Sequence, residues 1–92
     1  MFFITTLDPN DRTSRCVGYY TDFKSAEDVV LGNDYDINET CYKYAVIENI
    51  PAGVYQYDFE PKWYEWNEID EIYERIDKTP KEYKNETGFA IG

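Results

Sequence analysis

The pattern at the start of the chain, two β-rich runs on either side of a polar stretch, predicts a β-hairpin. Residues 2–7 and 15–20 are rich in aromatic and β-branched residues, which are enriched in strands. Between them lies the sequence Asp-Pro-Asn-Asp at 8–11, where proline presets φ and the Asx side chains bond the local backbone. We therefore expect two antiparallel strands joined by a loop of about seven residues.

The next segment has the spacing of a helix. Phe23, Ala26 and Val30 recur at i, i+3 and i+7, which places them along one stripe of a helix. The Thr-Asp pair before Phe23 offers an N-cap, and Gly32 supplies a C-terminal stop. We expect one principal helix over about residues 23–32, followed by a polar bend.

Two further strands are predicted in the middle of the chain. Residues 42–50 are apolar at odd and even positions, as in a central strand that is covered on both faces. Residues 54–60 alternate, with rings on one face and Asp58 and Glu60 on the other. This second pattern predicts a half-exposed strand with an acidic outer face.

The pattern at residues 63–76 supports two alternatives. Its apolar residues fit a helical stripe at i, i+3, i+4 and i+7, which comprises Ile69, Ile72, Tyr73 and Ile76. The same residues also fit two strands, 63–66 and 72–76, around a polar turn. Pattern alone slightly favours the helix, and a short strand is expected at 89–91.

Together these elements predict one α+β domain over residues 1–92. Its mainly antiparallel sheet would have four to six strands, with the helix at about 23–32 packed on one face. The chain has seventeen aromatic residues (ten Tyr, five Phe and two Trp), most of which must pack in the core of so short a domain. The expected core comprises Phe3, Leu7, Val17, Tyr19, Phe23, Ala26, Val30, Tyr44, Val46, Ile47, Tyr57, Phe59, Trp63 and Phe89.

Charge and composition exclude several classes of function. Nine basic against nineteen acidic residues give a net charge of −10, which argues against direct binding to nucleic acid or to an anionic membrane surface. Histidine is absent, so catalytic triads and His-containing zinc sites cannot form. Cys16 and Cys41 form no CxxC pair. We expect no enzyme activity, no cofactor and no metal, and thiols that stay reduced in a cytoplasm.

Four segments carry a resemblance that covers nearly the whole chain. They are Val-Gly-Tyr-Tyr-Thr-Asp-Phe-Lys-Ser-Ala-Glu at 17–27, Tyr-Lys-Tyr-Ala-Val-Ile-Glu at 42–48, Trp-Tyr-Glu-Trp at 63–66 and Gly-Phe-Ala-Ile-Gly at 88–92. The sequence resembles hypothetical proteins of about this length from gram-positive bacteria, their prophages and mobile elements. The resemblance implies turn residues after the Trp-containing segment, which favours the hairpin at 63–76. It implies no catalytic or ligand-binding residue.

An acidic stretch is the main candidate for a binding site. Eight carboxylates against two cations give residues 58–77 a net charge of −6, which would steer the protein toward a basic groove. A solvated acidic face that keeps the protein soluble is the alternative interpretation. The candidate partner-binding residues are Asp58, Glu60, Glu65, Trp66, Glu68, Asp70, Glu71 and Glu74. Trp66 would be the aromatic anchor, because Tyr and Trp are enriched at binding hot spots.

These observations lead to two functional hypotheses. The first is a small acidic binding protein, encoded by a phage or mobile element, that inhibits a host defence or nucleic-acid-handling protein by occupying its basic surface, by analogy with anti-CRISPR proteins. It would act in the cytoplasm of the host, and a homodimer is one way to cover its extra rings. The alternative is a sponge that sequesters a small signalling nucleotide. That function would require a positive pocket, formed by Arg12, Arg15 and Lys24.

Overall fold

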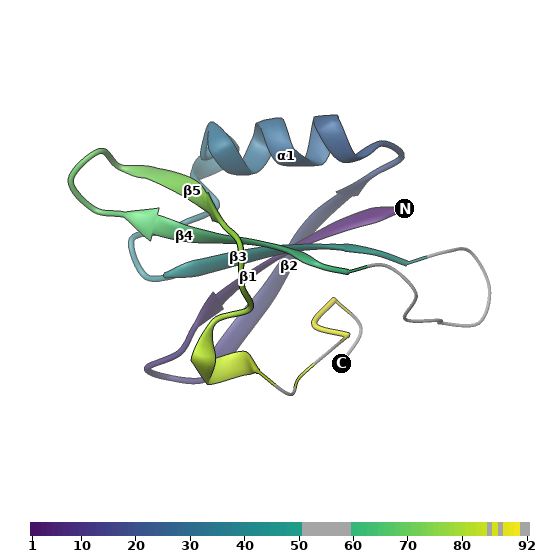
Figure 1. Ribbon diagram of the computed structural model, residues 1–92. Helices are drawn as coiled ribbons and strands as arrows, with labels where there is room; N and C mark the ends of the chain where they lie inside the picture. The colour runs from purple at the N-terminus through teal and green to yellow at the C-terminus, as the bar shows by residue number, and fades with distance from the viewer. Residues whose placement is uncertain (51–59, 85, 87, 91–92) are drawn as a thin grey trace.

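One antiparallel sheet and one helix make up most of the fold (Figure 1). The computed structural model describes residues 1–50, 60–84, 86 and 88–90. Within these ranges the elements are β1 (Phe2–Asp8), β2 (Thr13–Tyr20), α1 (Phe23–Leu31), a 3₁₀ turn at Asp34–Asp36, β3 (Tyr44–Asn49), β4 (Lys62–Asn67), β5 (Ile72–Ile76) and a 3₁₀ turn at Lys81–Tyr83. The strand order is β2-β1-β3-β4-β5 and every pairing is antiparallel. The predicted α+β class is confirmed at this level.

The N-terminal hairpin is tighter than its sequence predicts. The strands continue to Asp8 and restart at Thr13, so the turn occupies residues 9–12 only. The Asp8 carboxylate accepts a hydrogen bond from the Asn10 backbone N–H at 3.0 Å, an Asx interaction of the expected kind. The register shifts between Ile4 and Thr5, which places a β-bulge in the edge strand β2.

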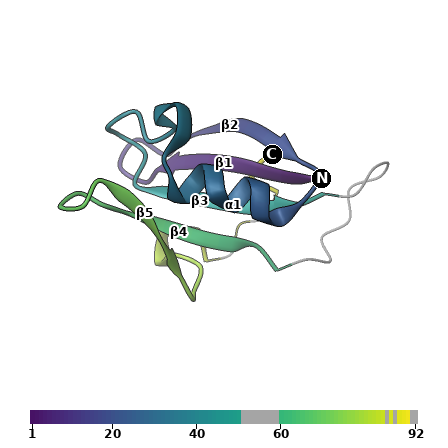
Figure 2. The same ribbon diagram turned by 90° about the horizontal axis from the view of Figure 1, so that it is seen from above.

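The helix begins and ends near the predicted positions. Its N-cap is Asp22, whose side chain accepts hydrogen bonds from the Ser25 N–H and hydroxyl, both at 2.9 Å. The helix ends at Leu31, and Asn33 rather than Gly32 adopts the left-handed conformation, with φ of 48°. Figure 2 shows α1 lying across the sheet.

A first core fills the space between α1 and the sheet. Its buried residues are Ile4, Ala26, Val29, Val30, Ile37, Ala45, Ile47, Tyr64 and Tyr73. The two tyrosines keep their hydroxyls paired: Tyr64 donates to Glu27 Oε2 at 2.5 Å and Tyr73 donates to the Tyr42 carbonyl at 2.6 Å. Buried tyrosines normally have such partners, because an unpaired hydroxyl would carry a desolvation cost.

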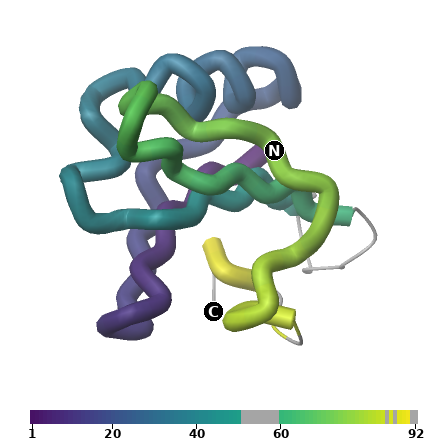
Figure 3. Tube along the Cα trace, turned by 60° about the vertical axis from the view of Figure 1, so that its left-hand side comes forward, coloured from purple at the N-terminus to yellow at the C-terminus, as the bar shows by residue number. Residues whose placement is uncertain are grey.

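A second core lies on the opposite face of the sheet, under the C-terminal segment (Figure 3). It contains Leu7, Tyr44, Val46, Trp63 and Tyr83, with Ile76 and Phe89 packed against them. Trp63 is 2% exposed and stacks on Tyr83, with ring centroids 5.6 Å apart. Both faces of β3 are therefore covered, as the apolar run at 42–50 predicts.

Glu48 ties the C-terminal segment to this second face. Its carboxylate is 2% exposed and accepts hydrogen bonds from the backbone N–H groups of Gly88 (3.0 Å), Phe89 (3.2 Å) and Ala90 (3.0 Å). Burial raises the pKa of Glu48, and the three hydrogen bonds oppose that shift. The segment is thus held by a buried ionisable side chain near the end of β3.

Several sequence predictions need correction or lie outside the described residues. Tyr19, expected in the core, is 58% exposed and contacts Phe3, because it pairs with Phe3 rather than with Ile4 and therefore faces away from α1. Phe89 and Ala90 lie in a turn rather than in a strand. The strand predicted at 54–60, with core residues Tyr57 and Phe59, falls almost entirely within residues 51–59, which are not among the residues that the structure describes.

Across the described ranges, α1 is the longest helix, and none of the helices has the length and apolar character that crossing a membrane requires.

Candidate interaction surface

The segment at 63–76 is a hairpin, not a helix. β4 and β5 pair from Trp63 opposite Ile76 to Asn67 opposite Ile72, and the turn between them stands at the far left of Figure 1. Tyr73 packs into the first core and Ile76 against the second core on the opposite face of the sheet, whereas a helix would place these two residues, three apart, on the same face. The hairpin confirms the alternative that the resemblance favours.

Asn67 stabilises the turn through its side chain, a role that was not among those predicted from the sequence. Its side-chain oxygen accepts hydrogen bonds from the N–H groups of Ile69 (2.9 Å) and Asp70 (3.1 Å). Its amide nitrogen donates to Asp70 (3.3 Å) and to Glu74 (3.1 Å). Glu71 completes the turn with φ of 55°. The turn is therefore fixed by side-chain hydrogen bonds, and an Asn before a run of polar residues is the signal that could have revealed it.

We call residues Glu68, Ile69, Asp70 and Glu71 the acidic tip. All four side chains are exposed, and Ile69 is 93% exposed. Among the ion pairs of the described residues, none involves Glu68, Asp70 or Glu71. The tip therefore presents uncompensated negative charge around one apolar side chain.

Behind the acidic tip, two more carboxylates face each other. Glu65 on β4 lies directly opposite Glu74 on β5, an arrangement in which like charges are destabilising. Lys43 lies 3.8 Å from Glu65 and offsets part of this repulsion. A cation bound near Glu65 and Glu74 would reduce the repulsion between them.

Trp66, the predicted aromatic anchor, keeps part of its ring exposed beside the acidic tip. It is half-buried on the α1 side of the sheet and contacts Tyr73 edge to face, with ring centroids 4.9 Å apart. Its remaining surface borders a pocket of about 570 Å³, which Cys41, Lys43 and Glu68 also line. Trp66 therefore lies beside the acidic tip but on the face of β4 opposite Glu65.

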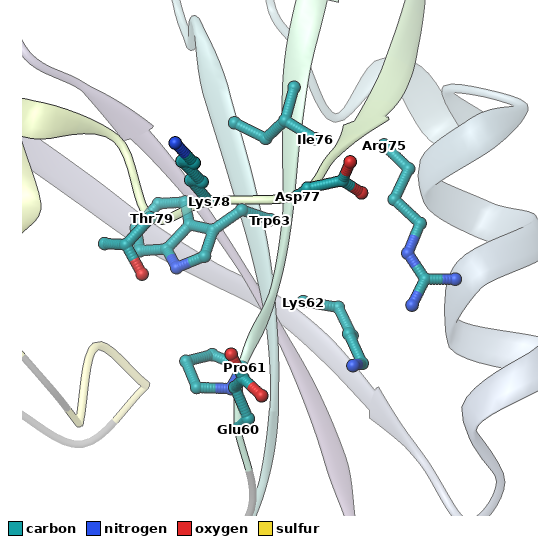
Figure 4. Close-up of a pocket in the computed structure, with 9 residues that line it drawn as sticks. All are labelled: Glu60, Pro61, Lys62, Trp63, Arg75, Ile76, Asp77, Lys78 and Thr79. Carbon is teal, nitrogen blue, oxygen red and sulfur yellow. The ribbon is translucent and has the colours of Figure 1, made fainter.

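The other two predicted site residues do not join this cluster. Glu60 is exposed just before β4, at the end of the strand away from the tip. Figure 4 shows it at a small pocket of about 90 Å³, where Arg75 and Lys62 extend toward the same side. Asp58 lies outside the described residues. Of the eight predicted residues, the structure gathers Glu65, Glu68, Asp70, Glu71 and Glu74 on the hairpin.

The cations proposed for a nucleotide pocket have separate carboxylate partners. Arg12 pairs with Glu86 at 2.8 Å and lies over the Tyr83 ring. Arg15 pairs with Glu39 at 2.7 Å, and Lys24 pairs with Asp28 at 3.0 Å along the helix. Each cation is neutralised on a different element. This arrangement does not supply the positive pocket that the sponge hypothesis requires.

The described residues show no cluster of three or more Cys, Asp or Glu side chains placed to hold a metal ion. Cys16 and Cys41 are both exposed free thiols. Desolvation, followed by the nearby carboxylate of Asp8, raises the pKa of Cys41. Because the thiolate is the reactive form, Cys41 has less of the nucleophile at neutral pH than an ordinary cysteine.

We predict that both thiols react in the folded protein without reductant. Cys16 should react faster than Cys41, because the raised pKa lowers the thiolate fraction of Cys41. Mass spectrometry after timed exposure to a thiol reagent, on the Cys16→Ser and Cys41→Ser variants, measures each rate separately. Faster reaction at Cys41 than at Cys16 would contradict the raised pKa of Cys41.

Comparison of the chain with protein-family models, with curated proteins and with solved structures finds no match.

Proposed function

We propose that this chain is a non-enzymatic binding protein that uses its β4–β5 hairpin to occupy a basic surface of another protein. The observation that carries the proposal is the acidic tip, where Glu68, Asp70 and Glu71 surround the 93% exposed Ile69 without an ion pair in the described structure. An exposed apolar side chain ringed by charge offers both a desolvated contact and electrostatic steering.

The hairpin is a suitable element for entering a groove. It lies at the edge of the sheet, and its turn is held by the Asn67 hydrogen bonds. A fixed loop loses little conformational entropy on binding, so more of the contact energy appears as affinity. The opposed Glu65 and Glu74 add a further reason to bind cations, because a partner's Lys or Arg would relieve their repulsion.

The proposed partner is a host protein whose basic surface normally holds nucleic acid. Such surfaces concentrate Lys and Arg, and an acidic protein of net charge −10 is attracted to them at long range. Together with the resemblance to proteins of prophages and mobile elements, this favours an inhibitor of a host defence or nucleic-acid-handling protein, acting inside the host cell. The experiment is capture of the partner from host lysate with tagged protein, followed by competition with nucleic acid.

The tip variant Glu68→Lys, Asp70→Lys, Glu71→Lys is expected to weaken binding to the captured partner by about tenfold or more at low salt, mainly through a slower association rate. The matched control is Asp11→Lys, Asp28→Lys, Asp77→Lys, which makes the same change in net charge at exposed carboxylates outside the hairpin. Surface plasmon resonance at two salt concentrations measures both rates. Equal loss in the two variants would remove the hairpin from the interface and leave only a net-charge effect.

A further inference from the structure

A groove runs beside β2, at the edge of the sheet opposite the β4–β5 hairpin. It has a volume of about 280 Å³, and its walls come from Val17 and Tyr20 on β2 and from Tyr35 and Ile37 after the helix. Pockets for drug-sized ligands range over about 300–1,000 Å³. This groove lies just below that range and has room for one large side chain, and we call it the β2 groove.

Gly18 leaves the floor of the β2 groove open. It pairs with Ile4 on β1, so a side chain here would point to the α1 side of the sheet. A Cβ atom placed on Gly18 would have no atom within 4 Å, and its backbone does not have the positive φ that requires glycine. Neither a positive φ nor a steric clash therefore explains why glycine occupies position 18. An edge-strand glycine is the kind of position that a large aromatic residue on a neighbouring strand covers.

β2 is the more accessible of the two edges of the sheet. Natural edges are protected by short strands, Lys, Pro, inward charges or bulges. β5 has five residues, of which Glu74 and Arg75 are charged. β2 has eight residues with neither Lys nor Pro, and besides its bulge it is protected only by Arg15, which is paired with Glu39. Within the described residues β2 pairs with β1 alone.

Tyr35 forms one wall of the groove at a conformational cost. It is 91% exposed and has φ of 59°, and the next residue, Asp36, has φ of 53°. Non-glycine residues in this region cost on the order of 1–3 kcal/mol and are concentrated at functional sites. The turn that carries Tyr35 is closed by Asn33, whose side-chain oxygen accepts a hydrogen bond from the Asn38 N–H and whose carbonyl accepts one from the Asp36 N–H, both at 3.0 Å. Tyr35 is therefore held in a strained turn, with its side chain available to pack against a side chain of a bound peptide.

From these four features we infer that the free edge of β2 binds an extended peptide segment as a sixth strand. The peptide would place one aromatic or large aliphatic residue opposite Gly18, inside the β2 groove. Main-chain hydrogen bonds along the edge supply affinity, and the groove selects the anchor residue. Directly opposite residues have Cβ atoms about 4.5–5.5 Å apart, so the anchor would cover Gly18 and contact Tyr35.

Charge selects a basic peptide over a second copy of this chain. Two copies of net charge −10 repel each other, whereas flanking Lys or Arg residues on a peptide are attracted. Asp34 and Asp36, both exposed, precede and follow Tyr35 in the sequence, and Arg15, which also lines the groove, is paired with Glu39 at 2.7 Å. The expected ligand is therefore an extended, Lys- or Arg-flanked segment of a partner protein with a central aromatic residue.

The test uses synthetic peptides of about nine residues, with β-branched residues around a central Trp and lysines at both ends. Binding to the ¹⁵N-labelled protein is measured by NMR. We expect amide shifts along Thr13–Tyr20 and around Tyr35. An alanine at the centre should weaken binding about tenfold, the equivalent of about 1.4 kcal/mol, and glutamates at the ends should abolish it.

The decisive variant is Gly18→Val, which fills the groove floor from within. It should keep the fold, because the space is open and valine favours strands, yet weaken peptide binding about tenfold or more. Ser14→Val, an exposed position on β2 outside the groove, is the matched control and should bind normally.

Three results would overturn the inference. The first is unchanged peptide binding by Gly18→Val. The second is loss of peptide binding in the tip variant, which would place the peptide on the β4–β5 hairpin. The third is a homodimer, seen by analytical ultracentrifugation, that Gly18→Val dissociates, since the occupant would then be a second copy. Because the tip variant leaves β2 unaltered, failure here would not affect the function proposed for the hairpin.

Discussion

Replacing Trp63 with alanine is expected to lower the free energy of unfolding by about 3–5 kcal/mol, the range for removing a large buried ring. Trp63 is 2% exposed and contacts Tyr44, Tyr83 and Phe89 through ring pairs 5.2–6.4 Å between centroids. These contacts join β4 to β3 and to the C-terminal segment. Since domains of this kind are stable by about 5–15 kcal/mol in total, this loss would be a large fraction of the free energy of unfolding.

Urea denaturation followed by circular dichroism measures this loss. Trp66→Ala is the matched control, because it removes the same side chain from the same strand. Trp66 is half-buried and has one ring partner, Tyr73, so its removal should cost clearly less. A larger loss for Trp66→Ala would contradict the assignment of Trp63 as the central residue of the second core.

Replacing Glu48 with alanine is expected to cost about 2–3 kcal/mol, because the N–H groups of Gly88, Phe89 and Ala90 would lose their shared acceptor. The C-terminal segment should also become more susceptible to proteolysis, since its main polar anchor is gone. Urea denaturation and limited proteolysis measure the two effects. Glu65→Ala is the control: it removes a half-exposed carboxylate on the neighbouring strand and should change stability by about 0.5 kcal/mol or less.

The difference in the free energy of unfolding between wild type and Glu48→Ala should change with pH in one direction. Burial raises the pKa of Glu48 above its usual value of 4.5. A carboxyl with a raised pKa contributes most to stability below its unfolded value, and that contribution is lost as pH rises through its folded value. The stability difference between wild type and Glu48→Ala should therefore be largest below about pH 4.5 and smaller at neutral pH. A difference that grows with pH would show that the three hydrogen bonds outweigh burial.

Local signals in the sequence correctly located several elements. The Asp-Pro-Asn-Asp turn, the Asp22 cap and the apolar run at 42–50 each have a short-range cause, so the N-terminal hairpin, α1 and the central strand follow from sequence alone. The position of Glu48 within the apolar run at 42–50 also indicates a buried polar contact. A carboxylate inside a strand covered on both faces must find buried partners, and here the partners are forty or more residues away in sequence.

The hairpin at 63–76 shows where pattern reasoning reaches its limit. Ile69, Ile72, Tyr73 and Ile76 satisfy a helical stripe, yet Ile69 lies exposed in a turn while Tyr73 is buried. Short apolar runs are compatible with both periods. The hairpin forms instead of a helix because β4 pairs with β3 and because α1 covers Tyr64 and Tyr73. These contacts join residues far apart in the sequence, so a local pattern cannot reveal them.

Local propensity and composition are enough to predict the α+β class, the position of the helix and the concentration of carboxylates between residues 58 and 77. Which of these carboxylates lie near one another depends on strand pairing. Strand pairing gathers Glu65, Glu68, Asp70, Glu71 and Glu74 on one hairpin, leaves Glu60 at the far end of β4, and turns Trp66 toward α1. Residues adjacent on a strand face opposite sides of the sheet, so nearness in sequence could not define the surface.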